Sequence, residues 1–192
     1  MRLDVQEKQQ EKEKKKIDWK AEIISWLWTI GIALAIVFVV NTFIARVVNV
    51  DGASMLPTLT HGERIITTPL HGELQRGDIV VIHRENDTAI IKRIVAVAGD
   101  TVDIDYDTGT LYVNGEAVEE DYISAPMHFV SYQGGNTKLP LTVEEGYVFV
   151  LGDNRNVSLD SRAAELGAVE EKAVFGKAIF RIWPFDKFGL IE

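Results

Sequence analysis

The stretch Val50-Asp-Gly-Ala-Ser-Met-Leu-Pro-Thr-Leu59 divides the 192-residue chain, because a long apolar run precedes it and a series of short strand patterns follows it. Small residues stand before Ser54, so another backbone segment can approach closely at this point. Pro57 has no N–H and a fixed φ, so it ends any helix or inner strand. The stretch therefore predicts a bend that presents the Ser54 hydroxyl to its surroundings.

The apolar run before the bend, residues 23–45, contains 23 residues without a charge. About 20 residues are enough to cross the hydrocarbon core of a bilayer, and Trp26 and Trp28 suit its interface. The alternatives are a buried helix of a soluble protein and a cleaved signal peptide, whose apolar region usually has about 7 to 15 residues. Because this run is longer, we predict an uncleaved transmembrane signal-anchor helix over residues 23–45.

The charges on either side of the run predict its orientation. Residues 1–22 form a polar tail with seven Lys/Arg residues. Only Arg46 and Arg64 follow the run within about 20 residues, which is the distance over which such charges count. Because positive charge is retained in the cytoplasm, we expect a single-pass protein of the cell membrane, with residues 46–192 on the extracytoplasmic side.

The composition argues against several classes of function. The chain has no cysteine, which excludes a disulfide framework and a cysteine nucleophile. Its net charge of −9 argues against a nucleic-acid partner. The four histidines stand singly and form no His-Glu-x-x-His motif. We therefore expect neither a metal site nor a cofactor.

The part of the chain after the run, residues 46–192, has the patterns of short strands. Asn114-Gly115, between two β-rich segments, predicts a two-residue hairpin. Residues 119–145 look irregular, and residues 161–172 have room for a helical turn. Since strands do not alternate with helices, we predict a mainly antiparallel β domain. The other predicted strands cover residues 64–68, 78–83, 89–98, 102–106, 147–151 and 174–184.

Lys92 lies inside the strand pattern of residues 89–98, with Ile90 and Ile94 on its face of the strand. At the reference pKa of about 10.4 a lysine is protonated at pH 7 and cannot act as a base. Burial among apolar side chains lowers that pKa by several units. Lys92 is therefore a candidate base for Ser54, because a nucleophilic serine requires one. The alternative is a lysine whose amine reaches solvent at a strand edge.

A polar stretch, residues 152–162, follows the strand pattern of residues 147–151. If it forms a wall of the site, Ser158 provides a hydroxyl that orients the lysine amine. The alternative is a capped loop that is held together by an ion pair. The candidate pairs are Asp160–Arg162 and Asp153–Arg155.

Four stretches of the chain resemble, in order, the conserved motifs of bacterial type I signal peptidases. They are Gly52–Thr58, Arg76–Val80, Lys92–Asp100 and Gly152–Arg162. The resemblance covers about residues 20 to 188. Gly52 stands where the best-known Gram-negative members have a serine that assists the oxyanion hole. This difference, the single anchor and the short chain favour the Gram-positive branch.

The resemblance implies a membrane-bound serine endopeptidase that removes N-terminal signal peptides from exported preproteins after small residues, typically Ala-x-Ala. In this family mechanism, Ser54 is the nucleophile, Lys92 is the general base and the Ser54 N–H binds the oxyanion. The other residues implied are Ser158, which hydrogen-bonds the lysine, and the site-supporting Asp153, Asp160 and Arg162.

We expect the substrate to add as an extended strand between residues 49–54 and 89–92. The expected pocket walls are Val50, Leu59 and Ile91. An apolar rim at Met55 and Leu56 is expected to enter the bilayer. The expected partners are therefore preproteins and membrane lipid, and neither nucleic acid nor metal.

Two other classes of protein share parts of this pattern. Self-cleaving repressors have a Ser-Met pair and a strand lysine, but the apolar run and the acidic charge count against them. A membrane-tethered binding domain would use Ser54 as a turn residue and Lys92 as an ordinary strand lysine. The Ser54→Ala variant distinguishes a peptidase from a binding domain, because a binding domain would keep its function.

Overall fold

A computed structural model describes residues 19–40, 44–69, 72–84 and 89–191 of the chain. The chain divides into two compact units, residues 1–40 and 41–192. Helix α2 (Trp19–Val39) has no buried residue, and an 18-residue window of it has a mean hydropathy of 2.1. The helix begins before the predicted run because Glu22 suits a first turn, where negative charge is favourable. The end of that run includes residues 41–43, which lie outside the described residues.

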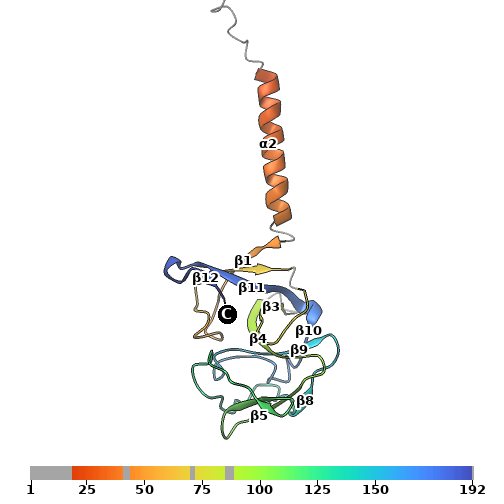
Figure 1. Cartoon of the computed structure of the whole chain (residues 1–192), viewed down its shortest axis with the longest axis vertical. Helices are drawn as coiled ribbons and strands as arrows, with labels where there is room; N and C mark the ends of the chain where they lie inside the picture. The colour runs from red at the N-terminus through yellow and green to blue at the C-terminus, as the bar shows by residue number, and fades with distance from the viewer. Residues whose placement is uncertain (1–18, 41–43, 70–71, 85–88, 192) are drawn as a thin grey trace, which may run out of the picture. The chain divides into compact units, whose positions relative to one another are not determined.

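The second unit is built on an antiparallel sheet of eight strands in the order β1-β2-β11-β3-β4-β9-β10, with β12 beside β11 (Figure 1). Each pair in this order runs antiparallel. The strands are β1 (Arg46–Asn49), β2 (Arg64–Thr68), β3 (Ile79–His83), β4 (Ala89–Val97), β9 (Tyr147–Leu151), β10 (Val169–Glu170), β11 (Val174–Trp183) and β12 (Gly189–Leu190).

A smaller antiparallel sheet has the order β7-β6-β5-β8. Asn114 and Gly115 connect β6 and β7 with φ values of 55° and 81°, as the predicted two-residue hairpin requires. Glycine and asparagine tolerate such positive φ values better than other residues do. The strands are β5 (Thr101–Asp105), β6 (Thr110–Val113), β7 (Glu116–Ala117) and β8 (Leu141–Thr142).

The mainly antiparallel β fold behind one N-terminal apolar helix confirms the predicted fold class. The prediction missed the short strands β1, β8, β10 and β12, which have between two and four residues each. Such segments are too short to show a period in the sequence, and their partners define them. In residues 161–172 there is no α-helix, and the 3-10 helix η2 (Glu171–Ala173) begins at the end of this range.

Consecutive residues of β3 pack into different cores. Ile79 and Val81 belong to the core that includes the bend, whereas Val80 and Ile82 belong to another core with residues of β9. Successive side chains of a strand point to opposite faces. Both faces of the sheet are therefore covered here, which explains the continuous apolar run in this strand.

The bend is anchored in its core by Met55 and Leu59, which are 2% and 0% exposed. The expectation of an exposed apolar rim at Met55 and Leu56 is therefore wrong for Met55, and Leu56 is half-buried. The turn at residues 53–59 directs the Met55 side chain inward, because the Leu59 N–H donates to the Met55 carbonyl at 2.8 Å and closes a helical turn. The core under the bend comprises Val50, Met55, Leu59, Ile65, Ile79, Val81, Ile91 and Ala178.

Candidate active site

The bend and β4 bring the Ser54 hydroxyl to the Lys92 amine. Ser54 Oγ and Lys92 Nζ lie 2.9 Å apart, within hydrogen-bond distance, although the residues are 38 positions apart in the chain. The bend is fixed at its start by the Val50 N–H, which donates to the Glu63 carbonyl at 2.8 Å. A hydroxyl and an amine at this distance can exchange a proton directly.

Lys92 is almost fully buried, with 3% of its surface exposed. Besides Ser54 Oγ, its amine contacts the Ile91 carbonyl oxygen at 2.8 Å. Burial lowers the pKa of Lys92 from 10.5 to about 8; Asp160 and Asp153 oppose this shift, and Arg84 adds to it. About half of the amine is therefore neutral near pH 8, and the neutral amine can accept a proton.

The loop after β9 forms the opposite wall of the site and touches the bend through its backbone. The Asn154 N–H donates to the Ser54 carbonyl at 2.9 Å. Gly152 permits this approach, because a Cβ at that position would lie 2.5 Å from the Ser54 carbonyl oxygen and 2.2 Å from Ser158 Oγ. Contacts this short are sterically excluded, so the loop requires glycine here.

Ser158 is buried beside Gly152. Its backbone is held by the Tyr132 hydroxyl, which donates to the Ser158 carbonyl at 2.9 Å. Within the described part of the chain, Ser158 Oγ has no hydrogen-bond partner. The expected hydrogen bond from Ser158 to the lysine is thus not formed in this structure. A buried hydroxyl without a partner is costly.

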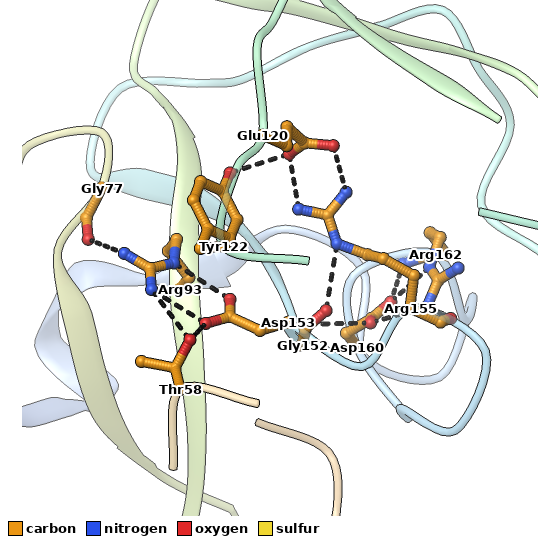
Figure 2. A network of polar contacts seen from close by, with 10 residues as sticks. All are labelled: Thr58, Gly77, Arg93, Glu120, Tyr122, Gly152, Asp153, Arg155, Asp160 and Arg162. Carbon is orange, nitrogen blue, oxygen red and sulfur yellow. Dashed lines mark hydrogen bonds and ion pairs between the residues drawn. The ribbon is translucent and has the colours of Figure 1, made fainter. Parts of the chain in front are cut away.

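Arg93, the neighbour of Lys92, lies in a buried ion pair with Asp153 (Figure 2). Its Nε and Nη2 donate to the two carboxylate oxygens of Asp153 at 2.9 and 2.8 Å, and its Nη1 donates to the Gly77 carbonyl at 3.0 Å. The Thr58 hydroxyl donates to the same carboxylate at 2.5 Å. One guanidinium group and its partner therefore connect β4, the bend, the turn before β3 and the loop after β9.

The loop after β9 contains a second ion pair and contributes to a third. Arg162 binds both oxygens of Asp160 at 2.8 Å, and this carboxylate also accepts from the Gly152 N–H at 3.1 Å. Arg155 binds both oxygens of Glu120 at 2.8 and 2.5 Å. The alternative pair, Asp153–Arg155, does not form, because each of its members has one of these other partners (Figure 2).

Several residues around the site were not identified from the sequence. Arg93 has no role in the sequence-based prediction, yet it is 3% exposed. The Tyr122 hydroxyl donates to Glu120 at 2.8 Å, and its ring lies 4.1 Å from the Arg93 guanidinium carbon. Glu120 and Tyr122 come from the segment that looked irregular, which gave no local signal. Asn154 lies inside the motif Gly152–Arg162, and its place in that motif was the only sequence feature that pointed to a role in the site.

A cavity of 110 Å³ adjoins the Ser54–Lys92 pair. Of the three residues expected to form pocket walls, Val50 and Ile91 line this cavity, whereas Leu59 does not and is packed in the core with them. β3 pairs with residues 89–93 of β4, but β9 pairs only with residues 93–97. In the described part of the chain, the second edge of residues 89–92 therefore has no strand partner, and it faces this cavity.

Comparisons with known proteins relate the sequence to signal peptidases. A family model described as signal peptidase, peptidase S26, matches residues 23–183. Signal peptidase IB of Staphylococcus aureus (strain COL) is 37% identical over 184 residues, covering 88% of this chain and 94% of that protein. Signal peptidase I of Bacillus licheniformis is 38% identical over 184 residues, covering 91% and 96%.

Among solved structures, a signal peptidase I from Enterococcus faecalis V583 is 35% identical, with a TM-score of 0.43, and the match covers 55% of this chain and 96% of that one. The extent of the family match and the identity to the curated relatives decide the assignment. The chain belongs to the signal peptidase family, peptidase S26, whose members are serine endopeptidases that remove signal peptides from exported preproteins.

Proposed function

We propose that this signal peptidase uses Ser54 as its nucleophile and Lys92 as its general base. The observation that supports this is the 2.9 Å distance from Ser54 Oγ to the buried Lys92 amine. Neutral Lys92 takes the Ser54 proton as Oγ attacks the scissile carbonyl, and it then returns that proton to the leaving amine. The resulting acyl-enzyme is hydrolysed by a water that the same lysine deprotonates. This reaction requires neither a metal nor a cofactor.

The Ser54 N–H is the proposed oxyanion donor. Within the described residues no hydrogen bond engages this N–H, so it is available to a substrate oxygen. Gly52 has no hydroxyl, and its own N–H donates to His61 Nδ1 at 3.3 Å. Removing one oxyanion donor commonly costs about 3 kcal/mol of transition-state stabilisation. The direction of the Ser54 N–H is therefore central to catalysis in this chain.

The proposed substrate is an extended segment that pairs with the free edge of residues 89–92 and lies beside residues 49–54. Backbone hydrogen bonds to such an edge hold a peptide of any sequence, and pockets for alternate side chains provide the selection. The cavity at Val50 and Ile91 has a volume of 110 Å³, which suits small side chains and supports cleavage after Ala-x-Ala. Ser158, Asp153, Asp160 and Arg162 are the proposed supporting residues of the site.

We further propose that α2 anchors the protein in the cell membrane, with residues 1–22 cytoplasmic and residues 46–192 extracytoplasmic as the peptidase domain. The length and hydropathy of α2 support a single span, and the lysine-rich tail supports this orientation. Lipid is therefore a partner of the anchor. Exported preproteins reach the extracytoplasmic side, where the peptidase domain lies, while they are being threaded across the membrane.

Because Met55 is buried, the bend does not offer the expected apolar rim to the membrane. We propose instead that the β domain contacts lipid through the segment from β11 to β12. Phe185 and Leu190 are 74% and 75% exposed in this segment, and Trp183 and Phe188 are also exposed. Replacing Phe185 and Leu190 with serine should lower activity about threefold in lipid vesicles and leave detergent activity unchanged. Phe129→Ser, at another exposed aromatic residue, is the control. Equal loss in vesicles and detergent would contradict lipid contact.

The test of the proposed chemistry is cleavage of a purified preprotein with an Ala-x-Ala site, in detergent, by the full-length protein and its Ser54→Ala and Lys92→Ala variants. The wild type should release a mature protein that begins after the second alanine, as measured by mass spectrometry. Both variants should be folded and inactive. Full activity of Ser54→Ala would show that the nucleophile lies elsewhere.

A further inference from the structure

Asn154 binds two successive carbonyl groups of the nucleophile bend. Its backbone N–H donates to the Ser54 carbonyl at 2.9 Å, and its side-chain Nδ2 donates to the Ala53 carbonyl at 3.1 Å. Nδ2 and the Ala53 carbonyl belong to residues 101 positions apart in the chain, so these contacts are made by the tertiary fold. A single residue thus fixes the peptide groups on both sides of the Ser54 Cα.

The Ala53–Ser54 peptide group contains the proposed oxyanion donor. This peptide is trans, since the cis peptide bonds of the described chain all precede prolines. In a planar trans peptide, the C=O and N–H groups point in opposite directions. A side chain that holds the Ala53 carbonyl on one side therefore directs the Ser54 N–H toward the other side.

We propose that Asn154 is a positioning residue for the oxyanion hole, acting through the Ala53–Ser54 peptide plane. Its side-chain amide holds the Ala53 carbonyl, so that the Ser54 N–H is aligned before the substrate arrives. This inference rests on the proposed role of Ser54. The inference gives the Asn154 side chain a role in the chemical step, in addition to the contact that the Asn154 backbone makes with the Ser54 carbonyl.

The surroundings of Asn154 are rigid enough to serve this purpose. Its neighbours in the chain, Asp153 and Arg155, are each in a bidentate buried ion pair. Arg155 Nε also donates to the Gly152 carbonyl at 3.0 Å, and Arg162 Nη2 donates to the Arg155 carbonyl at 2.6 Å. The loop is therefore held independently of the Asn154 side chain, which can be replaced while the loop stays in place.

The expected effect is intermediate in size. The Ala53 carbonyl also accepts a longer hydrogen bond, 3.3 Å, from the Leu56 N–H within the bend. Removing the Asn154 side chain therefore loosens the peptide plane without freeing it. Complete loss of an oxyanion donor lowers kcat by about 10²–10³. We expect a decrease in kcat of about tenfold for Asn154→Ala, with KM nearly unchanged.

The experiment compares full-length Asn154→Ala and Asn154→Asp with Asn156→Ala, in detergent, on the same preprotein. Asn156 is the matched control, because its side chain bonds the Pro126 carbonyl and the His128 N–H and does not contact the bend. Asn154→Asp keeps the size of the side chain but replaces the amide donor with a carboxylate. Both Asn154 variants should lose kcat, whereas Asn156→Ala should stay within about twofold of the wild type.

Two further measurements separate positioning from general damage to the site. A peptide aldehyde forms a tetrahedral adduct that uses the oxyanion hole, so its inhibition constant should rise about tenfold in Asn154→Ala. The affinity for the matching peptide alcohol, which forms no tetrahedral adduct and carries no negatively charged oxygen, should stay the same. The midpoint of the pH–rate profile should also stay the same, because Asn154 does not contact Lys92.

Normal kcat and normal aldehyde inhibition in both Asn154 variants would overturn the inference. A shifted pH midpoint in Asn154→Ala, or parallel loss of affinity for the aldehyde and the peptide alcohol, would overturn it too, since these results indicate a disordered site. The Ser54→Ala variant tests the underlying mechanism separately. If Ser54→Ala is inactive while the Asn154 variants are normal, the serine mechanism stands and only the positioning role fails.

Discussion

Lys92 and Arg93 are consecutive residues of β4, equally buried at 3% exposure, and they have opposite chemical surroundings. Lys92 contacts a hydroxyl and a carbonyl, and in the described part of the chain it forms no ion pair. Arg93 binds both oxygens of Asp153. Since successive strand residues point to opposite faces, the same strand provides an apolar side for one cation and a polar side for the other.

The comparison teaches that burial alone does not define the role of a charged side chain. Burial without an ion pair disfavours the ammonium form, so the pKa of Lys92 falls to about 8 and the residue suits a base. A bidentate bond to a buried carboxylate fixes the orientation of the Arg93 guanidinium, so this residue suits a structural connection. The following predictions test this division, in order of decreasing effect.

Lys92→Arg should abolish activity although the charge of the side chain is kept. Arginine is not deprotonated in proteins, so it cannot accept the Ser54 proton. Loss of a general base lowers the rate by about 10²–10⁴, and we expect the upper end of this range. Preprotein cleavage measures the effect, and circular dichroism checks the fold. A Lys92→Arg variant that cleaves at a rate within about tenfold of the wild type would contradict a lysine base.

Gly152→Ala should lower activity about 100-fold by separating the two walls of the site. The added methyl group would lie 2.2 Å from Ser158 Oγ and 2.5 Å from the Ser54 carbonyl oxygen. The loop must shift, and a displacement of about 1 Å in a catalytic group can cost this much. Gly189→Ala is the control for a glycine outside the site. Gly189 has open space at its Cβ position and no positive φ, so this variant should keep its activity.

Asp153→Ala should act mainly on stability, because it leaves the buried Arg93 without its carboxylate. Removing one partner of a buried pair costs about 3–5 kcal/mol of the free energy of unfolding. Arg93→Lys keeps the charge but loses the bidentate geometry, so a smaller loss is expected. Urea unfolding of the purified variants measures both. A larger loss of kcat than of stability for Asp153→Ala would place this pair in the chemical step.

Activity should rise with pH about fivefold between pH 7 and pH 8, as the neutral fraction of an amine with a pKa of about 8 increases. The folded state binds fewer protons than the unfolded state between about pH 8 and 10.5, so Lys92 should also make the protein more stable as pH rises through this window. Lys92→Met should lose this part of the stability profile. A rate that is flat from pH 6 to 9 would contradict the base role.

Local sequence patterns were sufficient for the main elements of the molecule. The apolar run predicted a membrane-length helix, and the period of two and the Asn114-Gly115 turn predicted the antiparallel strands, because residue period and turn chemistry are written in adjacent residues. The isoleucines around Lys92 predicted its burial in the same way. The order of four motifs predicted the family, and the serine and lysine that we propose for catalysis lie within two of them.

Tertiary structure alone decided the pairing of polar residues that are far apart in the chain. Arg93 and Asp153 are 60 positions apart, and Arg155 and Glu120 are 35 apart, so no local pattern relates them. The inward direction of Met55 and the short strands β1, β8, β10 and β12 also depend on distant partners. The physical reason is that the patterns for strands and turns extend over only a few neighbouring residues. Ion pairs and strand pairing depend instead on which distant segments the packed core brings into contact.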